Sequence, residues 1–449
     1  MERIRRGWAR GGLWLGLLLL IASPALSQFE GREKARRERE GKGRERTYEE
    51  KWTLDPANED PEWRRAHELY ATGHYDETLE LFEKFLKESP NEVSVACSMG
   101  GIYWDLGDYA RAEKWFDRAL EIVPRHVEAR KFKARMFYQM ARWTEAEKIF
   151  KELLTFENLR PDIRGSANLN LGKIALLRRR FRNAARHFIE AAKSPRKGHR
   201  SQAEKGRLMV VRFRRTLMWQ SEETKGLRVF FSPDIPAAGG KAGRRAFAER
   251  CQTALDRICR TLGMSFKEKL PLYVFKDEGQ AYEITGQDLP TWKYSWWILA
   301  TAWDRDPGYD IALQAVARVR GFRPSSKILV TGLAAYAAGL PNPHERARKL
   351  LAKGRLRTLA EMHVRQTYDL EEARPYGQSF VTWVIDTYGM DRFLESYAWF
   401  KLVLLDPVWR SKATGRMDWS GALTAIFRRG IGEDYPALER RWRDFLRGR

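Results

Sequence analysis

The chain has 449 residues, enough for two or three domains, and its 12% aromatic share with 17 Trp supplies ample material for hydrophobic cores. That composition is typical of a globular protein and excludes a wholly disordered chain. The 82 Lys and Arg outnumber the 59 Asp and Glu, a formal net charge of +23, which favours acidic partners or anionic surfaces or, as the plainer alternative, only keeps the chain soluble.

The first 27 residues have the pattern of a secretory signal peptide. Four arginines precede an apolar run at 13–22, and small residues at 25–27 offer a cleavage site. We therefore expect export to a periplasmic or extracellular location, with a membrane tether if the segment is not cleaved. The following stretch, 28–58, is rich in charges of both signs and predicts a flexible linker.

A repeat with a period of 34 residues follows. The segment GHYDETLELFEKFLKESP from Gly73 aligns with GDYARAEKWFDRALEIVP from Gly107. Further copies begin near 143 and, after a slip of four residues, near 181. The columns in register hold aromatic residues (Phe82, Phe116, Phe150 and Phe188), small residues (Thr78, Ala112, Ala146 and Ala184) and closing prolines (Pro90 and Pro124). This recurrence predicts helix-turn-helix units that bury their faces only by stacking.

These columns resemble the tetratricopeptide repeat over about residues 61–195. The resemblance implies an α-solenoid across 59–220, with about four repeats, a capping helix and a concave groove for a protein or peptide ligand. Within SANLNLG, Asn168 and Asn170 are candidates for holding a peptide backbone, because an amide side chain both donates and accepts hydrogen bonds. The alternative for these residues is ordinary solvated helix surface.

The stretch 173–215 is strongly basic. Its candidate basic patch consists of Arg178, Arg179, Arg180, Arg182 and Arg186. Such a flank suits an acidic protein or an anionic envelope surface of lipid or polymer, unless it is only a solvated face. The expected export argues against nucleic acid as the partner.

The pattern changes at Gly226. A short strand, an amphipathic helix over 243–262 and a second strand are followed by helices to the end of the chain. This order, together with ILVTGLAAYAAGL at 328–340 and the tail from YGQSF to RRWRDFL, resembles the peptidase-MA-like domain of the gluzincin metallopeptidases over 226–449. The resemblance implies an α+β domain with a small sheet, so the whole chain is expected to be mainly α.

The zinc site of such a domain needs two histidines one helical turn apart, a glutamate as general base and a third ligand on a later helix. By resemblance, the corresponding positions here are Leu313, Gln314, Ala317 and Thr331. These side chains provide no zinc ligand set, and a register one residue earlier brings neither imidazole nor carboxylate. His344 and Glu345 begin like the His-Glu-x-x-His motif of such a zinc site, but Arg348 stands where the motif has its second histidine. We therefore expect no zinc, no other cofactor and no catalytic residues.

The sequence thus predicts an exported, non-catalytic scaffold in which a repeat solenoid binds protein and a degenerate peptidase-like domain serves as a binding or structural module. Two alternatives stay open. One is a hydrolase that acts through a constellation assembled from distant segments. The other is an envelope-surface module that binds anionic lipid or polymer.

Overall fold

The computed structural model describes residues 61–236, 240–286, 298–316, 326–365, 370–403, 407–410 and 417–448. The expected signal peptide (1–27) and linker (28–58), and also Ala317, lie outside these ranges. Residues 59–449 form one unit of the chain. No helix within the described ranges is both long enough and apolar enough to cross a bilayer.

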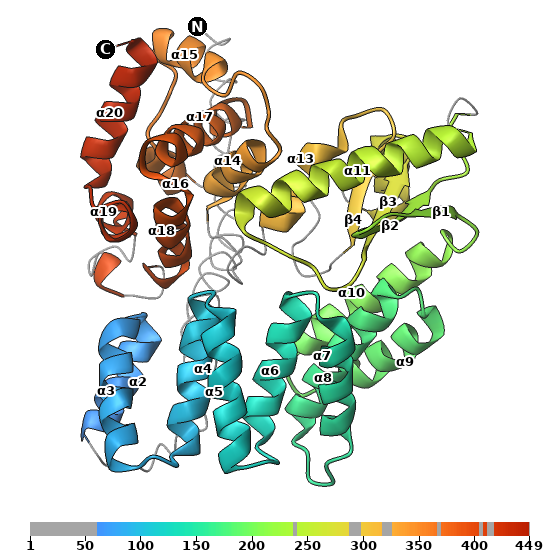
Figure 1. Ribbon diagram of the computed structural model, residues 1–449, viewed down its shortest axis with the longest axis vertical. Helices are drawn as coiled ribbons and strands as arrows, with labels where there is room; N and C mark the ends of the chain where they lie inside the picture. The colour runs from blue at the N-terminus through green and yellow to red at the C-terminus, as the bar shows by residue number, and fades with distance from the viewer. Residues whose placement is uncertain are drawn as a thin grey trace, which may run out of the picture. The chain divides into compact units, whose positions relative to one another are not determined.

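The first part of this unit is a stack of helix pairs followed by a long single helix (Figure 1). The helices are α2 (Pro61–Thr72), α3 (Tyr75–Glu88), α4 (Val93–Asp105), α5 (Tyr109–Ile122), α6 (Val127–Gln139), α7 (Trp143–Leu154), α8 (Pro161–Leu177), α9 (Phe181–Ala192) and α10 (Lys197–Arg214). Each pair packs on the next, so the expected solenoid is present with a helix after the fourth pair.

The turn inside each pair has one residue in the left-handed region. Gly73 and Gly107 fill this position in the first two pairs, with φ of 84° and 76°. Ala141 and Arg179 fill it in the next two, with φ of 54° and 57°. Glycine adopts this conformation freely, whereas a residue with a Cβ pays about 1–2 kcal/mol, so Arg179 must be held there by its contacts.

Aromatic rings pack directly on helix backbones between neighbouring helices. A Cβ added at Gly100 would lie 2.7 Å from the ring of Phe116, and one at Gly172 would lie 2.7 Å from the ring of Phe188. The Phe188 ring also lies against Gly206 of α10. Both rings are fully buried, so these glycines set how closely the helices approach.

A four-stranded mixed sheet follows, in the order β1-β2-β3-β4. Its strands are β1 (Gln220–Glu223), β2 (Leu227–Phe231), β3 (Leu270–Phe275) and β4 (Leu299–Ala302). β1 is antiparallel to β2, and the other two pairings are parallel, with Leu227 opposite Leu270 and Leu272 opposite Leu299. All six residues of β3 are buried, as expected for an inner strand covered on both faces.

Successive residues of β2 show what covers each face of the sheet. The ring of Phe231 lies 6.2 Å from that of Phe247 on α11 (Lys241–Leu262). Phe230 points the other way and stacks on Tyr273 of β3, whose ring lies 4.8 Å from Phe213 of α10. The solenoid's last helix therefore covers one face and α11 the other, because side chains alternate along a strand.

The remaining helices lie after the third and fourth strands. They are α12 (Glu278–Thr285), α13 (Pro307–Val316), α14 (Lys327–Ala337), α15 (Glu345–Ala352), α16 (Leu359–Arg365), α17 (Leu370–Tyr388), α18 (Met390–Val403), the 3-10 turn η3 (Pro407–Trp409), α19 (Trp419–Gly430) and α20 (Tyr435–Arg447). The mainly α prediction is confirmed, and a small mixed sheet is present as expected. The peptidase-like identity of this part stays a prediction.

α14 and α17 cross backbone against backbone. A methyl group at Gly332 would overlap the carbonyl oxygen of Gly377, and one at Gly377 would overlap the carbonyl oxygen of Ile328. Neither obstacle is the movable end of a side chain, so the two helices would have to separate to accept a larger residue.

We predict that Gly332→Ala lowers the free energy of unfolding by at least about 2 kcal/mol, because overpacking a tight crossing forces backbone shifts. The matched control is Gly198→Ala on α10, where an added Cβ meets nothing within 4 Å. That change should raise stability by about 0.5–1 kcal/mol, since alanine favours helix. Urea unfolding of both variants measures this, and a Gly332→Ala midpoint equal to that of the parent chain would contradict the crossing.

Candidate functional site

The first helices of successive pairs contact one another along the stack. α4 packs on α6, α6 on α8, and α8 on α10. Helices crowd most closely on the concave side of a superhelical stack, so this row marks its inner face, the usual binding surface of a solenoid.

Lys131 is the most unusual residue of this row. Its side chain is buried, with the residue 6% exposed. Its Nζ lies 4.4 Å from the centre of the Phe132 ring, and no carboxylate pairs with it among the described residues. Burial lowers the pKa of Lys131 to about 8, because the charged form loses hydration; Glu128 opposes that shift.

Other cations surround Lys131. Arg135 on the same helix and Arg196 at the start of α10 both lower its pKa further by repulsion. The same two arginines, after burial, also depress the pKa of His199, which falls to about 4. We call Lys131, Arg135, Lys173 and Arg196 the inner-face cluster. Its field is positive, and a carboxylate placed within it would be stabilised.

The members of the inner-face cluster differ in how they are held. Arg196 donates to Asp162 at 2.7 Å, and Lys173 donates to Gln202 at 2.8 Å, which ties α8 to α10. Arg135 is exposed, with its guanidinium carbon 5.3 Å from the centre of the Trp104 ring. Arg135 therefore lies at the rim of the cluster, where an incoming ligand would meet it first.

Sequence reasoning missed this cluster, although a signal was present. The position after each packing glycine or alanine of the first helices carries Gly101, Arg135, Lys173 and Arg207 in successive units. Three of these four residues are basic. Two members of this column, Arg135 and Lys173, belong to the inner-face cluster, so the recurrence of one charge in a column was the available signal.

The two asparagines proposed for peptide binding are buried, and their amide groups already have partners within the solenoid. Asn168 and Asn170 are 6% and 7% exposed. Asn168 donates to the carbonyl of Arg164 at 3.1 Å and contacts His187 at 2.9 Å, and Asn170 donates to the carbonyl of Ser166 at 2.8 Å. Their amide groups thus bond within the solenoid, and their role in binding stays a prediction.

The arginines of the candidate basic patch do not form one exposed surface, because some of them lie between the end of the solenoid and the sheet. Arg178 pairs with Glu147 at 2.5 Å and with Glu268, just before β3, at 2.8 Å. Arg180 lies 3.6 Å from the same Glu147. The pairs with Glu147 of α7 stay within the solenoid, whereas the pair with Glu268 joins the turn after α8 to the residues before β3, so Arg178 does not belong to a freely exposed patch.

Arg179 also lies inside this junction. Its guanidinium donates to the Thr216 hydroxyl at 3.0 Å and contacts the Tyr273 hydroxyl at 3.2 Å, with the Phe230 ring centre 4.2 Å away. Such stacking of a guanidinium on an aromatic face is favourable. Arg180, Arg182 and Arg186 are exposed, so within the candidate patch these three are more open to a partner than Arg178 and Arg179.

Comparison with known proteins agrees with the repeats. Residues 71–153 match the protein family described as "Anaphase-promoting complex, cyclosome, subunit 3". The chain is 30% identical over 124 residues to "Superkiller protein 3" of Schizosaccharomyces pombe (strain 972 / ATCC 24843), and 34% identical over 105 residues to "Cell division cycle protein 27 homolog A" of Arabidopsis thaliana. The repeats are of the tetratricopeptide type.

These likenesses are partial. They cover 26% and 23% of this chain, and 9% and 14% of the two relatives. The chain therefore spans less than a fifth of the length of either protein. Repeat solenoids of this type present an extended concave surface of the kind that binds proteins.

The positions compared with a zinc site carry no ligand set. Leu313 and Gln314 are buried on α13. Thr331, on α14, donates its hydroxyl to the carbonyl of Ile328 at 3.0 Å. Across the described residues, no three His, Cys, Asp or Glu side chains gather closely enough to hold a metal.

One carboxyl group is buried beside these positions. Asp310 on α13 accepts from the Thr301 hydroxyl of β4 at 2.7 Å, and burial raises its pKa to about 6. An acid of raised pKa can serve as a general acid or base, but it needs a reacting partner. Asp310 is only 2% exposed, so its hydrogen bond to β4 is best explained as a structural tie.

A serine–histidine contact tests the hydrolase alternative. His344 Nδ1 lies 2.9 Å from Ser379 Oγ, which also accepts from Trp442 Nε1 at 3.1 Å. A nucleophilic serine needs access to substrate and a base beside it. Ser379 is fully buried and its oxygen already has two partners, so the contact ties α17 to α20 and to the start of α15.

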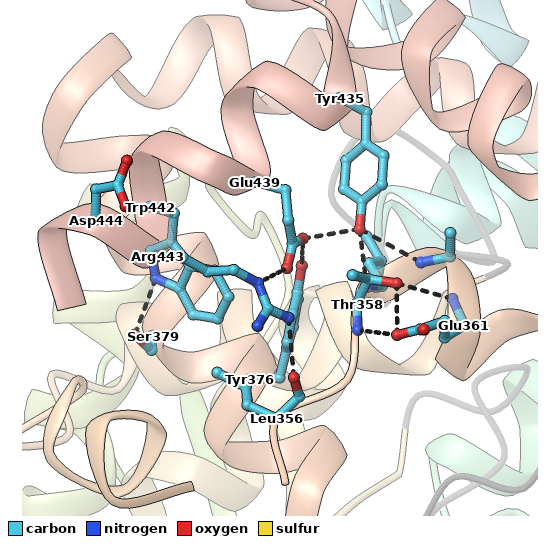
Figure 2. A network of polar contacts seen from close by, with 12 residues as sticks. Leu356, Thr358, Glu361, Tyr376, Ser379, Tyr435, Glu439, Trp442, Arg443 and Asp444 are labelled. Carbon is cyan, nitrogen blue, oxygen red and sulfur yellow. Dashed lines mark hydrogen bonds and ion pairs between the residues drawn. The ribbon is translucent and has the colours of Figure 1, made fainter. Parts of the chain in front are cut away.

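The polar network in Figure 2 likewise joins helices through buried hydrogen bonds, and it involves more residues. Glu439 on α20 accepts from the hydroxyls of Tyr376 and Tyr435 and, with its other oxygen, pairs with Arg443 at 2.8 Å. Arg443 also donates to the carbonyl of Leu356 at 2.9 Å. Burial, with the Glu439 charge beside it, holds the pKa of Tyr376 well above its usual range. A network satisfied in this way fixes helices and offers no free group for chemistry.

We predict that Glu439→Gln lowers the free energy of unfolding by about 3 kcal/mol, because Arg443 would be left largely buried without its carboxylate. Glu433→Gln is the matched control. Its side chain is 29% exposed where that of Glu439 is 6% exposed, and its pair with Arg441 is near the surface. The control should change stability by less than about 1 kcal/mol. Thermal unfolding distinguishes the two variants. Equal losses of stability in both would show that the buried network contributes no more than a surface ion pair.

Proposed function

We propose that this chain is an exported, non-catalytic scaffold whose tetratricopeptide solenoid holds an acidic segment of a protein partner on its inner face. The observation that carries the proposal is Lys131, a buried cation with no carboxylate partner among the described residues. Burying a charge without a counter-ion costs several kcal/mol. A residue that lowers stability in this way suggests a role that is fulfilled on binding.

The neighbours of Lys131 support an acidic ligand. Glu128 offsets part of the charge, whereas Arg135 and Arg196 add to it. A carboxylate from a partner would relieve that repulsion and replace the hydration that Lys131 has lost. The exposed Arg135 would draw the segment in, since charge complementarity acts mainly on the rate of encounter.

The finer parts of the proposal rest on sequence. Export rests on the N-terminal pattern of arginines, apolar run and small residues. The role of residues 226–449 as a degenerate peptidase-like module rests on the resemblance and on the side chains at Leu313, Gln314 and Thr331. A module of that kind would support the solenoid or bind a partner of its own, since fold alone does not give activity.

We predict that Lys131→Met weakens binding of a fluorescent polyglutamate peptide to the full chain by about tenfold at pH 7, because the peptide loses one buried charge partner. For the parent chain, affinity should fall as pH rises from 7 to 9.5, since Lys131 loses its proton with a pKa of about 8. The variant should lack this decline. Fluorescence anisotropy measures both, with polyglutamine of equal length as the uncharged probe.

The pH dependence of stability provides an independent test that Lys131 is buried as a cation. The pKa of Lys131 in the folded chain lies below its ordinary value of 10.5, so between pH 8 and 10.5 the unfolded chain binds the extra proton. The free energy of unfolding should therefore rise with pH in that window, and Lys131→Met should remove the rise. The control Lys148→Met, on the exposed surface of α7, should change neither property. Unaltered peptide binding by Lys131→Met would refute the proposed site.

A further inference from the structure

Exposed apolar side chains gather at the end of α10 and in the turn that follows it. The exposed fractions are 48% for Leu208, 65% for Val211, 51% for Leu217, 90% for Met218 and, on α12, 56% for Tyr282. We call these five residues the apolar tip. Large apolar side chains scattered singly are normal on a surface, whereas a group of this kind marks a contact surface.

The spacing places three members of the apolar tip, Leu208, Val211 and Met218, on one face. They lie three and seven residues apart, and Arg215 lies on the same face between the last two. Hydrogen bonds of the i to i+3 type continue the helical path beyond α10, from Thr216 to the carbonyl of Phe213 at 3.0 Å and from Leu217 to that of Arg214 at 3.1 Å. This face lies opposite the buried side of α10, which packs on α9 and on the sheet.

α12 extends the same surface. Arg212 donates to the carbonyl of Thr285 at 2.5 Å, and Arg215 lies 3.6 Å from Glu283. These contacts place the C-terminal half of α12, which carries Tyr282, against the last turn of α10. The apolar tip is therefore formed by two helices that are far apart in sequence.

Basic side chains surround the apolar tip. The stretch 197–218 holds seven Lys and Arg and one acidic residue, Glu204. Lys205, Arg214 and Arg215 are all exposed. Arg207 pairs with Glu204 at 3.1 Å, so it adds less to the net field.

We propose that the apolar tip and its basic rim dock this chain on an anionic lipid bilayer. Protruding apolar side chains enter the boundary between headgroups and acyl chains, while lysine and arginine bind the phosphate layer. The exposure pattern favours a bilayer over a partner helix, because a helix docks in a groove whose walls are half-buried. Met218, at 90% exposure, lines no such groove. This surface is distinct from the inner-face cluster, and the inference does not depend on the binding of an acidic segment.

The test is flotation of the purified full chain with vesicles of phosphatidylcholine alone or of phosphatidylcholine with phosphatidylglycerol. We expect binding only with the anionic lipid, and weaker binding as salt rises, because Debye screening reduces the attraction. The double variant Val211→Asp/Met218→Asp should lose at least tenfold in binding. Both residues are exposed, so folding should be retained, and circular dichroism checks this.

Two matched controls make the test specific. Val123→Asp places a charge at another exposed apolar residue, at the end of α5, and should leave binding unchanged. Lys205→Gln/Arg214→Gln should weaken binding by about 25-fold, at about fivefold for each charge. The exposed pair Lys114→Gln/Lys148→Gln, which removes the same charge elsewhere, should have a small effect.

An environment-sensitive dye at residue 218 reports the depth of contact. A dye-labelled Met218→Cys chain should shift its emission to the blue on anionic vesicles, whereas a labelled Val123→Cys chain should not. Equal shifts at both sites, binding to neutral vesicles, or unchanged binding by Val211→Asp/Met218→Asp would each overturn the proposal. Vesicle-independent self-association that Met218→Asp abolishes would instead assign the apolar tip to a contact between two copies, and would also overturn it.

Discussion

The buried ring of Phe188 sets the geometry on which the rest of the described chain depends. It lies against Gly172 on one helix and Gly206 on the next, so close that a Cβ at either position would lie within 2.7 Å of the ring. One aromatic side chain therefore fixes both the fourth helix pair and α10. Because interiors are close-packed, a change at this point is transmitted to every layer that α10 touches.

α10 in turn joins the solenoid to the sheet. Phe213 packs on Tyr273 of β3, and Arg179 reaches the same tyrosine from the turn after α8. Arg179 holds a left-handed conformation that glycine adopts at Gly73 and Gly107. Its stacking and hydrogen bonds at the junction compensate for that backbone cost. Solenoid and sheet thus share buried contacts. These contacts hold the last helices of the solenoid, which form one end of its inner face, in place.

Most of the solenoid could be predicted from sequence, because its packing follows columns of similar residues at a fixed spacing. Gly332 and Gly377 lie in two of the segments that carry the resemblance to the peptidase-like domain, but only the structure shows that they meet. The burial of Asn168 and Asn170 could not be predicted from sequence. Every residue from 165 to 177 is buried, polar residues included, so the polar positions of α8 do not mark a solvated face. Arg178 and Arg179 failed as a free patch because their partners, Glu268 and Tyr273, are about ninety residues away. Long-range pairing of this kind leaves no local pattern to detect.

Site-specific photo-crosslinking in the native host tests whether the inner face of the solenoid binds an acidic protein segment. A photoreactive amino acid replaces the exposed Arg135 at the rim of the inner-face cluster, or the exposed Lys148 on α7 as the control position. We expect a defined crosslinked partner rich in acidic residues from position 135 alone, lost when Lys131→Met is added and reduced in high salt. No product at position 135, or the same product at both positions, would show that the inner face does not bind such a segment.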